Sequence, residues 1–223
     1  MSTFDYNQIA REYDKWYQTP LGKQIDEWEK QLFLRHLKKL KTKNILEIGA
    51  GTGHWTSFFS DNNFSVTGID IAGRMLEQAK QKNIAGATFI EALAEDLPFE
   101  KESIDNVVAV TALEFVKDRH KAIEEIYRIL KPAGYFIIGG LNALGALQQE
   151  RQNDPVFKKA EFFTPESLYK VLEKFGMPYI EGCVYMPNTK ANLDEIIKAE
   201  NSVPINFLNI YGNFLVGSVK KEK

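Results

Sequence analysis

The sequence has a single cysteine, Cys183, among its 223 residues. One cysteine can form neither an intrachain disulfide nor a cluster of cysteine ligands around a metal, and this favours a reduced, intracellular setting. The sequence also lacks an apolar run near the roughly 20 residues that a membrane helix requires. Its first residues lack the basic start and apolar core of a secretory signal. We therefore expect a cytoplasmic protein with no metal site and no membrane insertion.

An excess of charge of either sign is also missing. The 28 basic and 30 acidic residues give a net charge of -2, and the pI is near 6.0. The chain therefore lacks the basic background that is typical of nucleic-acid binding, and no nucleic-acid partner is expected. The clearest basic cluster, residues 36–43, is interpreted as the solvated end of a helix.

The sequence shows no internal repeat, and its hydrophobic pattern changes near residue 44. Before that point, residues 3–17 and 22–40 are interpreted as two helices that form an N-terminal helical cap or lid over residues 1–43. Afterwards, short apolar runs alternate with amphipathic stretches, which predicts βαβ units. Strands are expected at residues 44–48, 65–70, 87–91, 104–110, 134–139, 179–186 and 214–220, and helices at 55–61, 72–82, 118–130, 165–175 and 191–200. The predicted fold class for residues 44–223 is α/β, with a seven-stranded, mostly parallel, doubly wound (Rossmann-like) sheet in one compact domain.

Three glycines, Gly49, Gly51 and Gly53, follow the first predicted strand and precede a helix. Glycine tolerates positive φ and lets the backbone approach a ligand closely, and the following helix offers unpaired N–H groups. A dinucleotide-binding fold would place a pyrophosphate here, but the carboxylate of Glu47 would repel it. A carboxylate suits a ligand with an ammonium group, as in S-adenosylmethionine. The alternative interpretation of the glycines is a tight structural turn.

Asp70 ends the second predicted strand. A carboxylate at this place can accept hydrogen bonds from both ribose hydroxyls of an adenosine. The alternative role for a single aspartate here is the N-cap of the next helix. Its strand-end position, together with the glycine loop, favours the ligand.

Four stretches in this order resemble the class I S-adenosylmethionine-dependent methyltransferases: LEIGAGTG, GIDIAGRML, ALAEDLPFEKESIDNVVA and EEIYRILKPAGYFII. The similarity is to the ubiquinone/menaquinone-biosynthesis-type small-molecule methyltransferases and covers residues 44–138. It implies S-adenosylmethionine as cofactor, S-adenosylhomocysteine as product and a small-molecule methyl acceptor. The cofactor-binding residues that it implies are Glu47, Gly49, Ala50, Gly51, Thr52, Gly53, Asp70, Ile71, Met75, Ala94, Glu95, Asp96 and Thr111.

The resemblance also distributes these residues over the cofactor. The glycine loop and Thr111 would hold the methionine part, with Glu47 near its amino group, and Asp70 would bind the ribose. The adenine would be contacted by Ile71, Met75 and residues 94–96. Leu93 is a departure, because the family often has an aspartate there that reaches the adenine amino group.

The stretch AREYDKWY, residues 10–17, resembles the opening of many of these enzymes, in which a helix folds over the cofactor pocket. Tyr13 and Trp16 are the predicted lid residues and complete the expected cofactor site. Aromatic rings there would exclude water and attract the methyl sulfonium by cation–π interaction. The alternative is an aromatic stripe that packs on the sheet.

No catalytic residue is assigned, because methyl transfer is an in-line displacement in which proximity and orientation supply much of the acceleration. His54, beside the glycine loop, is a candidate by its chemistry alone, with capping or packing as the other interpretation. His120 is expected on an exposed helix. Residues 141–164 are interpreted as a possible insertion on the acceptor side, where Asn142, Arg151 and Phe163 are the expected substrate contacts.

Other functions remain open at this point. A non-catalytic S-adenosylmethionine-binding regulatory or partner protein would show the same glycine loop. A nicotinamide-dependent dehydrogenase is disfavoured, because the loop reads G-x-G-x-G rather than G-x-G-x-x-G. A nucleic-acid methyltransferase is disfavoured by the acidic balance and by the absence of an N/D-P-P-Y motif. The oligomeric state is not indicated.

Overall fold

The structure is a computed structural model that describes residues 13–146, 148, 156–187, 190–203 and 210–222. Most of the predicted helix over residues 3–17 lies outside these ranges. Its described end is the short 3-10 helix η2 (Trp16–Gln18). Helix α2 (Pro20–Leu37) follows and begins where Thr19 accepts a hydrogen bond from Gly22 N at 3.0 Å. A threonine cap followed by proline at the first position is a favoured helix start.

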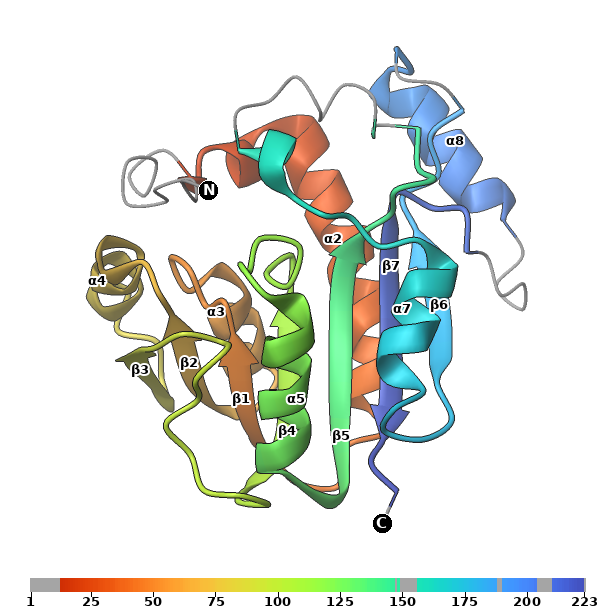
Figure 1. Cartoon of the computed structure of the whole chain (residues 1–223). Coiled ribbons are helices and arrows are strands. Elements are labelled where there is room, and N and C mark those ends of the chain that lie inside the picture. Colours follow the sequence, from red (N-terminus) through yellow and green to blue (C-terminus); the bar gives the residue numbers. More distant parts are fainter. Residues whose placement is uncertain (1–12, 147, 149–155, 188–189, 204–209, 223) are drawn as a thin grey trace.

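Seven strands form a single sheet in the order β3-β2-β1-β4-β5-β7-β6 (Figure 1). They are β1 (Asn44–Ile48), β2 (Ser65–Asp70), β3 (Ala87–Glu91), β4 (Ile104–Val110), β5 (Leu130–Leu141), β6 (Tyr179–Cys183) and β7 (Phe214–Lys220). The first five pair in parallel, and β7 runs antiparallel to both β5 and β6. The predicted seven-stranded, mostly parallel Rossmann-like sheet is therefore confirmed.

Strands β5 and β6 differ in their bounds from the sequence prediction, which placed them at residues 134–139 and 179–186. Strand β5 begins at Leu130 because Leu130 pairs with Ile104 of β4 before the register shifts. Strand β6 ends at Cys183 rather than at residue 186, since Val184 takes a φ of 64°, outside the extended region. The remaining helices are α3 (His54–Asp61), α4 (Gly73–Gln81), α5 (Arg119–Ile129), η3 (Phe157–Lys159), α7 (Pro165–Leu172) and α8 (Leu193–Ser202).

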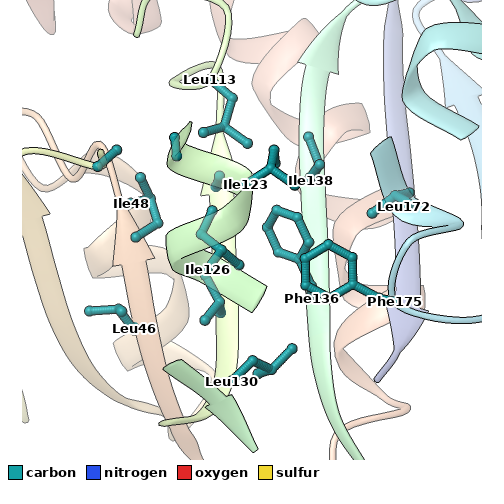
Figure 2. Packing of buried hydrophobic residues seen from close by; sticks show 14 of the residues in the cluster. Leu46, Ile48, Leu113, Ile123, Ile126, Leu130, Phe136, Ile138, Leu172 and Phe175 are labelled. Atoms are coloured by element: carbon teal, nitrogen blue, oxygen red, sulfur yellow. The ribbon is translucent and has the colours of Figure 1, made fainter. Parts of the chain in front are cut away.

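Helices cover both faces of the sheet. One face packs against α5 and α7, where Ile123, Ile126 and Leu172 meet Phe136 and other strand residues (Figure 2). The opposite face packs against α2 and α3 through side chains that include Phe33, Trp55 and Phe59. Most of the buried side chains in both layers are apolar, so their burial is the main stabilising contribution.

Helix α2, predicted as part of a cap, is packed into this second layer. Its residues Leu32, Phe33 and Leu37 are at most 3% exposed. His36 was expected in a solvated basic cluster, but it is fully buried, and its Nδ1 lies 2.8 Å from Ser218 Oγ of β7. The prediction for His36 is wrong because the helix end faces the sheet edge, while the neighbouring Lys38 and Lys41 are exposed.

Two residues expected to contact a substrate are structural. Asn142 is 1% exposed, and its Nδ2 donates to the carbonyls of Ile210 and Gly212. Phe163 is fully buried in the layer with α5 and α7. Arg151, the third expected contact, lies outside the described residues. His120 is exposed on α5, as predicted.

Within the described ranges, no helix has the length and apolarity needed to cross a bilayer. In the same part of the chain, no group of three or more His, Cys, Asp or Glu side chains could hold a metal ion.

Candidate functional site

The order of the strands reverses between β1 and β4, which places a crevice at the carboxyl ends of these two strands. The loop after β1 and the residues after β4 meet there. Gly49 has a φ of 76°, and a Cβ at this position would lie 2.3 Å from the Cβ of Ala112, which follows β4. Only glycine permits this approach, so Gly49 brings the two sides of the crevice into contact.

Gly51 differs from Gly49 in what surrounds it. Its φ is 52°, and a Cβ there would meet no protein atom within 4 Å. Gly51 also lines the cavity at the crevice. The loop therefore leaves open space beside its backbone at this residue, as a ligand-binding loop requires.

Glu47 lies beneath the loop, near the end of β1, and is 1% exposed. Its Oε2 accepts a hydrogen bond of 2.5 Å from Thr56 Oγ1 of α3. Burial raises the pKa of this carboxyl to about 8, although the Thr56 hydrogen bond lowers it. Within the described part of the chain no lysine, arginine or histidine pairs with Glu47. A buried carboxyl without a cation is costly to ionise, so the site is suited to a ligand that brings positive charge.

Asp70, at the end of β2, is tied to the backbone of the glycine loop and to the backbone that follows β2. Its Oδ2 accepts from Gly51 N and its Oδ1 from Ala72 N, each at 2.8 Å. Burial raises the pKa of Asp70, and these two hydrogen bonds lower it. Each carboxylate oxygen has a second lone pair. Asp70 can therefore hold the glycine loop and still accept from a ligand.

Thr111, at the end of β4, has a φ of 44°. This left-handed conformation is strained for a β-branched residue, and such outliers concentrate at functional sites. Thr111 lines the same cavity as Glu47 and Gly51. Its N–H donates to Gly139 O at 2.8 Å, so β5 holds the strained residue in place.

Two tyrosines from the segment before α2 close the crevice. Tyr13 packs against Ala72 and Met75, next to the end of β2. Tyr17 stacks on the ring of His54, with centroids 3.7 Å apart and planes 10° apart. The two tyrosine rings meet edge to face at 6.2 Å. They form an aromatic wall that spans the crevice from α4 to α3.

The cavity under this wall is about 40 Å³, whereas sites for small ligands usually measure roughly 300–1,000 Å³. The wall is also anchored by Asp14, whose carboxylate accepts from Thr52 Oγ1 and pairs with Lys82, both at 2.6 Å. Asp14 and Lys82 are about one-third exposed, so their ion pair stabilises the closed position only weakly. Entry of a nucleoside-sized ligand therefore requires residues 13–17 to shift.

The cavity lining includes seven of the residues predicted from the sequence: Tyr13, Glu47, Gly49, Ala50, Gly51, Thr52 and Thr111. Gly53 lies behind the loop, where a Cβ would contact Ile84 and Ala79 of the α4 region. Trp16 is 45% exposed and does not line the cavity. Tyr17 and His54 line it instead, and neither was predicted as a cofactor-binding residue. Tyr17 belongs to the same AREYDKWY stretch as Tyr13, so the motif contained the signal.

The predicted adenine residues lie beyond β2 and β3, outside the cavity. Ile71 and Leu93 are 60% and 45% exposed, and Met75 is buried in a cluster with Ala72 and Tyr13. Glu95 is engaged elsewhere, because its Oε1 accepts from the backbone N–H groups of Lys117 and Asp118. This surface therefore offers apolar side chains to a flat ring.

Comparisons with known proteins identify the family of this chain. The family described as methyltransferase domain matches residues 46–138. A crystal structure of an S-adenosylmethionine-dependent methyltransferase, possible histamine N-methyltransferase, from Thermotoga maritima covers 98% of both chains with a TM-score of 0.76 and 27% identity. The chain belongs to the class I S-adenosylmethionine-dependent methyltransferases. Its cofactor is S-adenosylmethionine, and it is a methyltransferase enzyme.

Two sequence relatives extend the comparison. This methyltransferase is 34% identical to an uncharacterised protein of Methanocaldococcus jannaschii, over 81% of this chain and 83% of that protein. It is 31% identical to the ubiquinone/menaquinone biosynthesis C-methyltransferase of Geotalea daltonii, over 60% of each chain. The chain thus spans well under the full length of the second relative.

The residues at the crevice fit the chemistry of S-adenosylmethionine. The ammonium group of the cofactor would supply the cation that Glu47 lacks among the described residues, and Gly51 leaves open space beside the loop. When bound, the cofactor supplies a methyl group on a sulfonium. The aromatic wall would exclude water from it, and the carboxyl groups of Glu47 and Asp70 would orient it.

Asp70→Ala is expected to weaken S-adenosylmethionine binding by at least about 1 kcal/mol, the scale of a hydrogen bond to a charged group. It should also lower stability, because Gly51 N and Ala72 N lose their acceptor. Titration calorimetry measures the first effect and thermal unfolding the second. Asp105→Ala is the control, since Asp105 lies near the start of β4 and pairs with Lys131. Equal cofactor affinity in Asp70→Ala and wild type would refute the ribose assignment.

Proposed function

We propose that this methyltransferase transfers the methyl group of S-adenosylmethionine to an apolar small-molecule acceptor. The observation that carries the proposal is a row of phenylalanines beyond the carboxyl end of β4. Phe115 follows Thr111 in the same turn, and its ring lies 6.0 Å from that of Phe157 in η3. Phe157 in turn lies 6.2 Å from Phe162. These rings favour an apolar or ring-shaped acceptor beside the methionine end of the cofactor.

We propose that the predicted residues bind the following parts of the cofactor. Glu47, the glycine loop and Thr111 hold the methionine part, and Asp70 binds the ribose. Ile71, Met75 and residues 94–96 lie along the adenine, with Leu93 adding apolar surface. Tyr13 covers the adenosine side. Residues 141–164 form the acceptor side, supported by the position of Phe157 and Phe162 in this segment.

Methyl transfer requires the residues on the acceptor side chiefly to position the acceptor. The acceptor atom attacks the methyl carbon in line with the departing sulfur, so holding both partners close supplies much of the acceleration. The aromatic wall of Tyr13 and Tyr17 excludes water from the methyl donor. No residue is assigned as a base.

The relatives named as ubiquinone/menaquinone biosynthesis C-methyltransferase and demethylmenaquinone methyltransferase support an acceptor with a quinone-like ring. An acceptor screen tests this. The protein is incubated with methyl-labelled S-adenosylmethionine and either reduced quinones, small apolar phenols, polar amines or short nucleic acids, and S-adenosylhomocysteine and labelled product are measured. We expect turnover with the apolar ring compounds alone. Turnover confined to amines or nucleic acid would contradict the proposal, and cofactor binding without turnover on any acceptor would favour a non-catalytic binding protein.

A further inference from the structure

His54 has a set of contacts that the proposed function leaves unexplained. It is the first residue of α3, directly after the glycine loop, and it lines the cavity with Tyr17. Its Nε2 lies 2.7 Å from Oδ1 of Asp26 on α2. Tyr17 stacks on its ring. Helix α2 thus holds the edge of the imidazole, and the face of the imidazole covers the ring of Tyr17.

Asp26 is suited to hold this ring because it remains ionised. Burial raises the pKa of its carboxyl, but hydrogen bonds from His54 and Lys30 outweigh burial and lower it. Lys30 Nζ donates to the other oxygen, Oδ2, at 2.6 Å. His54 Nε2 also lies 3.1 Å from Lys30 Nζ, so it either donates to Asp26 or accepts from Lys30. Either hydrogen bond fixes the orientation of the imidazole from α2. The ring plane on which Tyr17 stacks is therefore defined by α2.

The two tyrosines lie at different parts of the cofactor site. Tyr13 packs on Ala72 and Met75 at the end of β2, which is the adenosine side. Tyr17 stacks on His54 at the start of α3, next to the loop that holds the methionine part. Tyr17 is thus the wall ring beside the glycine loop, where the proposed assignment puts the sulfonium, and a stacked ring presents a fixed π-system to a cation.

We propose that His54, held by Asp26, is a positioning residue that fixes the Tyr17 ring at the methionine end of the site, where Tyr17 favours the sulfonium of S-adenosylmethionine over the neutral thioether of the product. This inference rests on the proposed assignment of the cofactor-binding residues. A stacked and edge-bound imidazole acts here through Tyr17 and not as a base. The aromatic wall then binds the charged cofactor more tightly before methyl transfer than it binds the uncharged thioether of the product afterwards.

A double-mutant cycle tests the proposal with S-adenosylmethionine and S-adenosylhomocysteine as ligands in titration calorimetry. Tyr17→Leu is expected to weaken binding of the cofactor several-fold more than binding of the product. His54→Gln keeps a donor for Asp26 but removes the ring. It should also lower the ratio of the affinity for S-adenosylmethionine to the affinity for S-adenosylhomocysteine. In the Tyr17→Leu background, His54→Gln should change the ratio less than twofold, because coupled residues are not additive. An equal effect of His54→Gln in both backgrounds would overturn the proposal.

Variants of Asp26 provide a second, independent test. Asp26→Asn keeps an acceptor for His54 Nε2 and should preserve the ratio of the two affinities, whereas Asp26→Ala should lower it. A purely structural role would weaken both ligands alike and leave the ratio unchanged, and that result would also overturn the proposal. His120→Gln, at an exposed histidine of α5, is the matched control. If the wild-type protein bound neither ligand, the cofactor-site assignment itself would fail, which is a different outcome from an unchanged ratio.

Discussion

The Glu47→Gln variant is expected to bind S-adenosylmethionine at least about tenfold more weakly than wild type and yet to be more stable without ligand at pH 7. The loss of affinity follows from the charge pair between the carboxylate and the cofactor's ammonium group, since a hydrogen bond to a charged group contributes about 1.5–3 kcal/mol. Glutamine has nearly the same shape and can still accept from Thr56, so the change removes charge and not packing.

The gain in stability follows from the raised pKa of Glu47. The folded protein holds the proton up to about pH 8, whereas the unfolded chain releases it near pH 4.5. Because the folded pKa lies above the unfolded one, stability is fully present below pH 4.5 and falls as the pH rises toward 8. Between pH 4.5 and 7 this amounts to about 3 kcal/mol at most. Glutamine does not ionise, so the variant avoids this loss.

Denaturant unfolding of the two proteins at pH 4.5 and pH 7 measures the difference. The two should be similar at pH 4.5, which serves as the internal control, and the variant should be more stable at pH 7. Cofactor affinity of wild type should rise between pH 6 and 8 by up to about tenfold per pH unit, because binding releases the proton of Glu47. The variant should lack this part of the pH dependence. A variant that binds as tightly as wild type would remove Glu47 from the cofactor site.

Gly51→Ala is expected to reduce S-adenosylmethionine affinity by at least about tenfold while the protein remains folded. A Cβ at Gly51 meets no protein atom within 4 Å, so it enters the open space beside the loop, where we place the cofactor. The substitution also has a backbone cost, because alanine at a φ of 52° is strained by about 1–2 kcal/mol. That cost lowers stability whether or not a ligand is bound.

Gly86→Ala is the matched control for the backbone cost. Gly86 has a φ of 67°, and a Cβ there would come no closer than 3.9 Å to its neighbours. Both variants should therefore show a similar decrease in melting temperature, and only Gly51→Ala should lose cofactor affinity. If calorimetry gave equal affinities for the two variants, the cofactor would not lie against Gly51.

The sequence alone predicted the elements whose signals are local. The bounds of β1, β2, β3, β4 and β7 agree with the structure, because short apolar runs bounded by turn residues predict strands without reference to distant residues. The glycine loop and Asp70 were likewise readable, since strand-end positions in this fold converge on one crevice. The class of cofactor followed from the order of the motifs.

The tertiary structure decided everything that depends on contacts between distant segments. Residues 17, 26 and 54 belong to three separate elements, and their stack and hydrogen bond arise only because α2 packs across the start of α3. Asn142 and His36 looked available in the sequence, yet packing buries both. The raised pKa of Glu47 is also a tertiary property, because it comes from burial under the glycine loop and not from the residues beside it in the chain. The sequence therefore determined the glycine loop, because its motif is local. The packing of α2 against α3 determined the aromatic wall that lies over the loop.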